Sequence, residues 1–496
     1  MRRALGFLLR DSLVYGVAGA ANRLVKIVLL PVVARAFPAE AFGAFDTVGV
    51  YVYVLAVAGI LGLNSAVIIV ATRSGSAATP DLMRGPAAIS LRMTAVVSLV
   101  LAAAFLVAPA WWSSQLLGTR EHAGAIAWGA ASVPFSALLI YFLSLLQWAF
   151  RRTWYVTIAF GSALLTVLLS YLVAFHSSLG INGLFAANLI GQAAGALAAG
   201  FACRDMLRST WSWAAARPLL AIGLPFAVIA LASNLVPSVD RIFLVRFHSL
   251  AEAGIYGLGQ KIAAISSLVL AGFQAAWGPF AFAQRSDPGK PKVFGKVFLL
   301  VCSLAAYLAV VLAVSAPFIA RIVATGEYAG AAIFVGPLAL SAGLGAVFFV
   351  VAIGSVLEGK SLHNLTAYAI GLGATVVLNI GLARIGTPPI GIAWANCAGQ
   401  ALAVACMAGL AQRVHPVPYP FGRGAVILLA AVPLCVFGAR AGGPISVLAL
   451  GAALLAVTAG FAGWLWVGVL DASGRARLRA LVTRGGPGFG EGGPIG

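Results

Sequence analysis

Long apolar segments separated by short polar loops follow one another along most of the chain. A helix needs about 20 apolar residues to cross the hydrocarbon core of a bilayer, and these segments reach that length. The pattern predicts an all-α polytopic membrane protein with about fourteen transmembrane helices. We place them near residues 12–34, 42–70, 87–108, 123–146, 154–175, 180–202, 218–244, 255–283, 294–318, 331–357, 362–385, 389–411, 424–440 and 444–470.

Composition and charge fit this topology. The chain is 61% hydrophobic and only 9% charged, whereas soluble domains carry about 25% charged residues. Its formal net charge of +19 suggests nucleic acid as a partner. Once the spans are threaded back and forth, however, most of the 32 lysines and arginines fall on the side of the N-terminus. This asymmetry satisfies the positive-inside rule, so we expect both termini in the cytoplasm and no nucleic-acid partner.

One short motif occurs twice. The segment from Gly183 to Gln192 returns from Gly391 to Gln400, with Gly, Asn, Gly and Gln repeated at a constant offset. Further pairs keep nearly the same register, including Asn22 with Asn234, Gly43 with Gly254, Arg73 with Arg285, and Arg151 with Lys360. Because the copies are six spans apart, they have the same orientation in the membrane. The sequence therefore predicts two parallel six-helix repeat bundles plus two C-terminal helices.

The duplication predicts four parts of the chain. They are an N-terminal six-helix unit (1–210), a C-terminal six-helix unit (211–415), two additional transmembrane helices (416–470) and a cytoplasmic basic, Gly-rich tail (471–496). Within the repeated motif, small residues such as Gly191 and Gly195 allow close approach of helix backbones. We interpret the motif as a helix-packing element that is not part of the functional site.

The first predicted span carries two cations and an amide. Arg23 lies at its middle, about 16 Å from either surface at 1.5 Å per residue, and Lys26 and Asn22 share its face. A charge at that depth costs about 2.5–3.5 kcal/mol, so these cations need water, a partner or a substrate. One interpretation is an anion-attracting face in a central cavity. The other is a buried ion pair with an acidic side chain, for which the candidates are Asp11, Asp46 and Asp240.

A second polar group follows in spans 7 and 8. Asp240 and Arg241 come after Pro225, Asn234 and Pro237, as in the interrupted helices of transporter binding segments. The alternative is a local Asp–Arg salt bridge at the water interface. Lys261, next to Gln260, lies close enough to the outer end of its span to snorkel. We take Asn234, Arg241 and Lys261 as candidate substrate contacts and Asp240 as the candidate ion-coupling site.

Catalytic and metal-binding patterns are missing from the sequence. The 13 acids form no D-x-D or E-x-x-H pair, and no G-x-x-x-x-G-K-[ST] loop is present. The five cysteines lie in or beside spans and form no C-x-x-C pair. We therefore expect no enzyme, no metal and no cofactor.

Several short motifs resemble those of polysaccharide-biosynthesis membrane proteins over about residues 8–415. This family includes oligosaccharide flippases of the O-antigen and exopolysaccharide type, within the multidrug/oligosaccharidyl-lipid/polysaccharide exporter superfamily. The order and spacing of the motifs carry the resemblance, since none is diagnostic alone. They are Tyr15-Gly16, Pro31-x-x-x-Arg35-x-Phe37, Glu40-Ala-Phe-Gly43-Ala-Phe45, Gly62-Leu-Asn-Ser-Ala66, Asp240-Arg241, Ala253-Gly254-Ile-Tyr256 and Trp277-Gly-Pro279-Phe280. One departure is that Val67 to Ala71 are apolar where many relatives have a basic residue.

The resemblance implies a flippase in the bacterial inner membrane. It would move undecaprenyl-diphosphate-linked oligosaccharide to the outer leaflet, coupled to protons or sodium, with membrane lipid, a polysaccharide polymerase and a chain-length regulator as partners. Arg23 and Lys26 would recruit the diphosphate, since Arg offers bidentate hydrogen bonds and Lys a point charge. Asn22 and Asn234, equivalent in the two units, would contact polar groups of the substrate.

Three alternatives remain at this stage. A flippase for the lipid-linked peptidoglycan precursor would also have fourteen spans and a cationic cavity. A multidrug or cation antiporter of the same fold would want a carboxylate where span 1 has cations. A non-transporting membrane scaffold would have a sealed core without a hydrated cavity.

Overall fold

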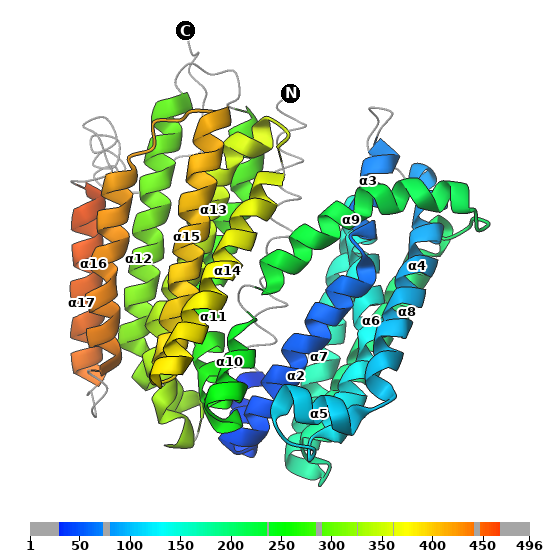
Figure 1. Ribbon diagram of the computed structural model, residues 1–496, viewed down its shortest axis with the longest axis horizontal. Helices are drawn as coiled ribbons and strands as arrows, with labels where there is room; N and C mark the ends of the chain where they lie inside the picture. The colour runs from blue at the N-terminus through cyan, green and yellow to red at the C-terminus, as the bar shows by residue number, and fades with distance from the viewer. Residues whose placement is uncertain are drawn as a thin grey trace, which may run out of the picture.

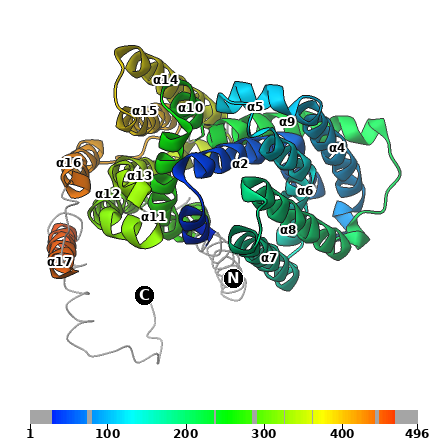
Figure 2. The same cartoon turned by 90° about the horizontal axis from the view of Figure 1, so that it is seen from below.

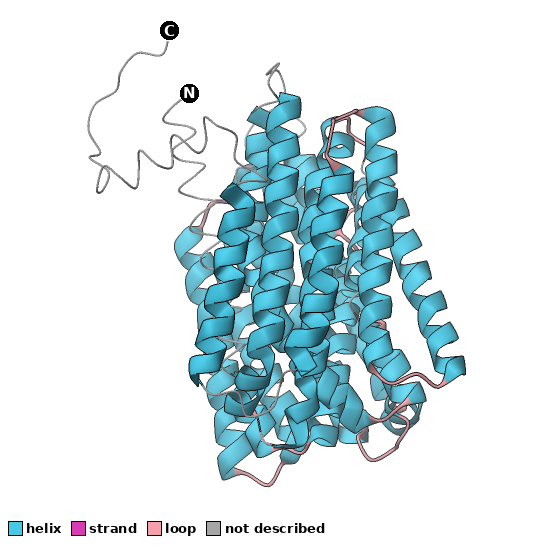
Figure 3. Ribbon diagram, turned by 90° about the vertical axis from the view of Figure 1, so that its left-hand side faces the viewer, coloured by secondary structure: helices cyan, strands magenta, loops and turns pink. Residues whose placement is uncertain are grey.

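A computed structural model describes residues 29–72, 80–235, 238–283, 290–324, 326–360, 362–440 and 447–466. Throughout these ranges the regular elements are helices (Figure 3). A helical segment over residues 29–36 comes first. It is followed by α2 (Ala39–Ile60), α3 (Leu63–Thr72), α4 (Pro80–Leu106), α5 (Pro109–Leu117), α6 (Ala123–Trp148), α7 (Arg152–His176), α8 (Gly180–Ala202), η1 (Arg204–Met206), α9 (Trp213–Leu235), α10 (Asp240–Phe247), α11 (Leu250–Ala283), α12 (Lys290–Val323), η2 (Gly326–Ala331), α13 (Ala332–Leu357), α14 (Leu362–Ile385), α15 (Ile390–Val414), α16 (Phe421–Arg440) and α17 (Val447–Trp464).

The helix lengths confirm a multi-pass membrane protein. Twelve helical segments of the described ranges are long and apolar enough to cross a bilayer, and a shorter apolar helix covers Leu448–Trp464. These thirteen match the second to fourteenth predicted spans. Most of the first predicted span, with Asn22, Arg23 and Lys26, lies outside the described residues. The largest differences in boundary are at α9, which ends at Leu235 rather than near residue 244, and at α4, which begins at Pro80 rather than near residue 87. Proline suits a first helical position, and Asp81 favours a helix N-terminus.

The helices form two groups that lie side by side (Figure 1). One contains α2–α8 and the other α10–α17, while α9 packs against α2, α3 and α4 and also against α14. The groups converge at the end where α10 lies and diverge toward the end where α3 lies, as Figure 1 shows. Seen from below, α2 lies between the groups (Figure 2). We call the end where α10 lies the α10 end. We call the end where α3 lies the η1 end, because η1 follows α8 there.

The groups meet where α2 crosses α11. A Cβ atom on Gly43 would lie 1.9 Å from the Leu250 carbonyl oxygen, and one on Gly254 would lie 2.0 Å from the Ala39 carbonyl oxygen. The contact is reciprocal, and Gly43 and Gly254 are one of the sequence-matched pairs. Backbones this close leave no room for a side chain at either position.

The repeated motif makes the same packing contact in both groups. A Cβ atom on Gly191 of α8 would lie 1.9 Å from the Thr166 hydroxyl oxygen of α7. One on Gly399 of α15 would lie 1.9 Å from the Thr375 hydroxyl oxygen of α14. These glycines therefore act in helix packing, as predicted for Gly191.

Candidate functional site

A cluster of polar side chains lies at the α10 end, between the two groups. Its members come from α2, α10, α11, α13 and α15, and the surrounding helices are strongly apolar. Polar groups in such surroundings are costly unless they are paired. We call this set the α10 cluster; it consists of Asp46, Asp240, Arg241, Tyr256, Gln260, Lys261, Ser341 and Asn396.

A break after α9 positions the two charges of α10. The helix α9 ends at Leu235, and α10 starts at Asp240, so the predicted interruption is present. Pro225 does not cause it, because this proline lies inside α9. The eight-residue α10 packs against α11, α14, α15 and α5. Its first two residues thereby reach partners on three other helices.

One half of the cluster is an ion triad around Asp46. Arg241 donates from Nε and Nη2 to Asp46 Oδ2, at 3.0 and 2.6 Å. Lys261 Nζ lies 2.7 Å from the other oxygen, Oδ1. The Arg241 side chain is 0% exposed and that of Asp46 is 3% exposed, whereas that of Lys261 is 46% exposed. We call these three residues the Asp46 triad.

Neighbouring side chains add contacts to Arg241, whose Nη1 has no hydrogen-bond partner among the described residues. Arg241 Nη2 also donates to Gln260 Oε1, and its guanidinium carbon lies 4.9 Å from the centre of the Tyr256 ring. Gly257 leaves room for the carboxylate, since a Cβ atom there would lie 2.7 Å from Asp46 Oδ2. Gly257 follows Gly254 as Asp46 follows Gly43, so the two groups differ at this matched position.

The other half of the cluster surrounds Asp240. Tyr256 donates its hydroxyl to Asp240 Oδ2, and Asn396 Nδ2 donates to the same oxygen at 2.8 Å. Ser341 in turn donates to Asn396 Oδ1 at 2.7 Å. Asp240 is fully buried, and its Oδ1 accepts no hydrogen bond within the described part of the chain. A buried carboxyl oxygen with spare acceptor capacity is suited to a proton or a cation.

The structure places the predicted site residues in different surroundings. Asp240, Arg241 and Lys261 all belong to the α10 cluster. The alternative of a local Asp–Arg salt bridge at the interface is wrong, because both side chains are buried and Arg241 pairs with Asp46 on another helix. Asn234 lies outside the cluster and donates to the Ala230 carbonyl of its own helix at 2.8 Å. Arg23, Lys26 and Asn22 fall outside the described residues.

Sequence reasoning missed part of the cluster. The sequence indicates Asp46 only as a partner for the span 1 cations and Asn396 only as a packing residue of the repeat. An acid within an apolar span was the available signal for Asp46, because such a residue is rarely there without a role. Asn396 gave no such signal, because the matched position in the first unit is also an asparagine, Asn188. In the structure the two asparagines have different environments, and Asn188 accepts a 3.4 Å hydrogen bond from Gln192.

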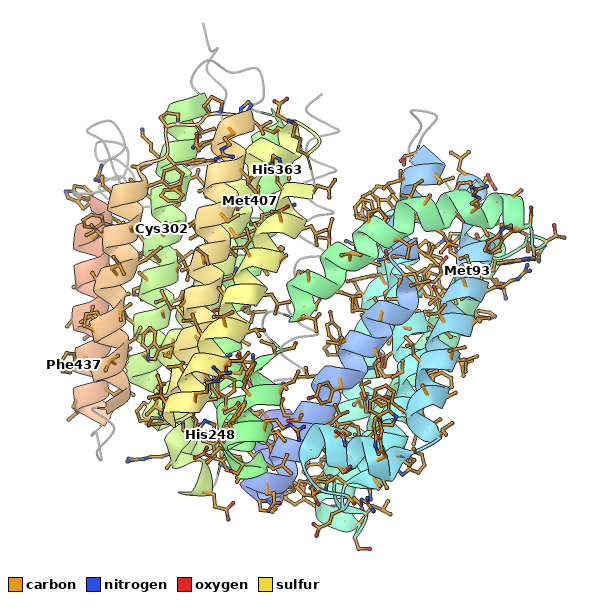
Figure 4. The ribbon with its side chains drawn as sticks, in the orientation of Figure 1. Met93, His248, Cys302, His363, Met407 and Phe437 are labelled. Atoms are coloured by element: carbon orange, nitrogen blue, oxygen red, sulfur yellow. The ribbon has the colours of Figure 1, made fainter. Side chains whose placement is uncertain are left out.

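A second set of contacts closes the α10 end. Glu327 of η2 accepts a hydrogen bond from the Ala39 backbone N–H at 3.1 Å, and Tyr328 donates to the Phe37 carbonyl at 3.0 Å. The Tyr328 ring also meets Phe42 edge to face at 5.8 Å. The start of α2 is therefore held by η2, which precedes α13. Figure 4 shows His248, just after α10, at this end and His363 at the opposite one.

The η1 end has a different character. Arg151, just before α7, makes a two-pronged ion pair with Asp205 of η1, with Nη1 2.8 Å from Oδ1. The Arg151 guanidinium lowers the pKa of Asp205 by this hydrogen bonding. Arg92 donates to the Ser209 carbonyl at 2.6 Å. In the described ranges, His, Cys, Asp and Glu form no group of three that could hold a metal.

Two helical groups of this form define the class of protein. The fold is similar to that of solved transporters, one of which is a member of the MOP superfamily. It is similar to the lipid II flippase MurJ in an inward closed conformation, with a TM-score of 0.72 and 13% identity over 92% of this chain and 99% of that one. An inward-facing multidrug MATE transporter gives a TM-score of 0.65 and 13% identity, covering 83% and 96% of the two chains. A Vibrio cholerae MATE transporter gives 0.60 and 17%, covering 83% and 98%.

The family follows from the sequence. The model of the polysaccharide biosynthesis protein family matches residues 8–283, and the chain belongs to this family. No curated protein matches it in sequence.

Proposed function

We propose that the protein is a flippase that moves undecaprenyl-diphosphate-linked oligosaccharide across the bacterial inner membrane by alternating access. One observation carries the proposal: in a polysaccharide-biosynthesis chain with a transporter fold, a buried ion pair between described residues joins the two helical groups at the α10 end of their interface. An ion pair at one end of the interface suits a molecule in which one group rocks against the other.

The η1 end is the cytoplasmic end in this proposal. Arginines gather there, whereas the α10 end has fewer; those at the η1 end include Arg84, Arg92, Arg151, Arg152, Arg204, Arg208 and Arg217. The positive-inside rule supports this orientation and cytoplasmic termini. The described conformation is then closed on the outer side.

The repeat provides the moving parts. We divide the chain into units 1–210 and 211–415, an appended pair of helices in 416–470 and a tail in 471–496. The reciprocal contact of Gly43 and Gly254 and the matched contacts of Gly191 and Gly399 support the two parallel six-helix units. The crossing of α2 and α11 is a natural pivot between them.

Cations recruit the diphosphate. Arg23 and Lys26 of the first span are the main candidates, with Asn22 and Asn234 as polar contacts. Lys261 adds a half-exposed ammonium from the α10 cluster. Arg241 has a different role from the one first assigned, because its guanidinium is fully buried against Asp46 and Gln260. It holds the cluster together rather than contacting substrate.

Asp240 is the candidate coupling site. Its Oδ2 is held by Tyr256 and Asn396, while its Oδ1 has no hydrogen bond from the described residues. A proton or sodium ion arriving at Oδ1 would change the charge at the junction of α10, α11 and α15. Such a change biases two packings of the same helices.

The decisive experiment replaces Arg23. Arg23→Ala should abolish export of the oligosaccharide repeat unit in cells while protein levels stay intact. Arg120→Ala, which removes an exposed arginine between α5 and α6, is the matched control and should leave export unchanged. Full export in the Arg23 variant would contradict the proposed substrate role.

Two further assays separate the other functions. A requirement for cell-wall synthesis would indicate the lipid-linked peptidoglycan precursor as substrate. Drug efflux would indicate a multidrug antiporter. Loss of polysaccharide export without any transport by the purified protein would favour a scaffold for polymerase and chain-length regulator.

A further inference from the structure

We propose that Asp46 is a positioning residue that an anionic substrate group displaces from Lys261, and that this displacement opens the α10 end. The proposal rests on the proposed function, because it assumes a diphosphate substrate. It adds a route by which that substrate drives the conformational change.

The two cations of the Asp46 triad differ in access. Arg241 is fully buried and bonds to Oδ2 of Asp46, with Gln260 as a further acceptor. Lys261 bonds to Oδ1, and almost half of its side chain is exposed. Only Lys261 can therefore change its partner without leaving a buried charge behind. An ammonium on a flexible stem makes such an exchange readily.

The triad also crosses the interface between the groups. Asp46 lies on α2, while Arg241 and Lys261 lie on α10 and α11. Asp46 is three residues after Gly43, so it faces α11 about one helical turn from the crossing with Gly254. The bond from Lys261 to Asp46 therefore closes the interface just beyond the pivot.

A diphosphate competes well for Lys261. It carries more negative charge and more acceptor oxygens than one carboxylate, and charge-assisted hydrogen bonds are the strong ones. When Lys261 turns to a phosphate, Asp46 loses one of its two cations and α2 loses one of its bonds to α11. A ligand shifts a conformational equilibrium only by its different affinity for the two states. Because Lys261 is fully available only when the bond to Asp46 is broken, the diphosphate favours the open state.

The contact of Glu327 with Ala39 offers a matched control. It holds the start of α2 at the same end of the molecule, but it contains no member of the Asp46 triad. Weakening it should loosen the closure without altering the competition for Lys261. Glu327→Gln therefore separates general loosening from anion-driven release.

The test measures exposure of the closed end in the purified full-length protein in detergent. A cysteine is introduced at Ala39, which is 5% exposed and faces Gly254, and its labelling rate with a hydrophilic maleimide is followed. The parent protein, with its own five cysteines, gives the background. Inorganic diphosphate is the probe, and we expect it to raise the labelling rate severalfold.

The variants then assign the effect. Lys261→Gln should remove the response to diphosphate, and Lys261→Arg should restore it. Glu327→Gln should raise the rate without diphosphate and keep the response. Asp46→Asn should label rapidly with or without diphosphate; if it does not fold, the Lys261 pair of variants still decides. A response that survives in Lys261→Gln, or no response in Ala39→Cys with the Asp46 triad intact, would overturn the proposal.

Different results would contradict the displacement of Asp46 and the proposed function. If cells with the parent protein export oligosaccharide but diphosphate leaves Ala39→Cys labelling unchanged, the displacement of Asp46 is wrong and the flippase stands. If cells make and export polysaccharide without the protein, the proposed function is wrong, whatever the labelling shows.

Discussion

Two ion pairs at opposite ends of the molecule show how differently the same chemistry is used. Arg241 and Asp46, at the α10 end, are 0% and 3% exposed and come from different helical groups. Arg151 and Asp205, at the η1 end, are 27% and 38% exposed and lie within one group. In both pairs two guanidinium nitrogens donate to the carboxylate, to one oxygen of Asp46 and to both oxygens of Asp205, so the number of hydrogen bonds does not distinguish the pairs.

Their surroundings decide what each pair does. An exposed pair gains little from Coulomb attraction in water and is screened by salt. A buried pair has lost its hydration, so each charge depends on the other to offset the cost of burial. A buried pair across a moving interface resists separation unless a replacement partner arrives. We infer that the η1 end sets topology through its positive charge, while the α10 end controls conformation.

Removing Asp46 should have the largest effect. Asp46→Asn leaves the Arg241 guanidinium buried with Gln260 but without its carboxylate, and breaking such a pair costs about 3–5 kcal/mol. We expect a marked loss of thermal stability in detergent and loss of export. The double variant Asp46→Asn with Arg241→Gln should lose less stability than the two single variants added together. Additive losses would show that the two residues do not act as a pair.

The crossing of α2 and α11 should be the next most sensitive point. Gly43→Ala places a methyl group against the Leu250 carbonyl, and overpacking of this kind costs about 1–3 kcal/mol. Export should fall because the pivot is forced apart. Gly49→Ala, on the same helix with nothing within 4 Å, is the matched control and should export normally. If the two alanine variants exported equally well, the crossing of α2 and α11 would not be the pivot.

Neutralising Asp240 should separate coupling from closure. Asp240→Asn keeps the side-chain size but removes the charge that Tyr256 and Asn396 contact. We expect export to lose its dependence on the ion gradient, by about 5- to 150-fold if the coupling has a typical strength. Flipping is measured in proteoliposomes with the proton and sodium gradients varied separately. An unchanged gradient dependence in this variant would remove Asp240 as the coupling site.

The sequence predicted the helices well because each span is locally encoded. An apolar run of about 20 residues has few other solutions in a bilayer, so thirteen described helices fall where the pattern indicated. The repeat identified Gly43 and Gly254 as equivalent, and the structure adds that they touch each other. Local signals cannot show which sequence-distant helices meet.

The α10 cluster shows which parts of a site local sequence signals can identify and which they cannot. Asp240, Arg241 and Lys261 were identified because charges within apolar segments are conspicuous. Their partners were not, because the bond from Arg241 to Asp46 joins residues far apart in the chain. The neighbour of Asp240 in sequence was the obvious partner and was the wrong one. The sequence-based alternative paired two adjacent residues, whereas Arg241 has its counterion on another helix.

Removing Asp205 should have the smallest effect on stability. Asp205→Asn deletes an ion pair that is partly exposed, and such pairs contribute about 0.2–1 kcal/mol at most. Because Arg151 lowers the pKa of Asp205, the stabilisation is present above the unfolded-state pKa and is lost as the pH falls through the folded-state pKa. Thermal unfolding at low and high salt should show a small difference from the parent protein that salt reduces further. A loss as large as that of Asp46→Asn would mean that the η1 end also controls conformation, and the contrast between the two ends would fail.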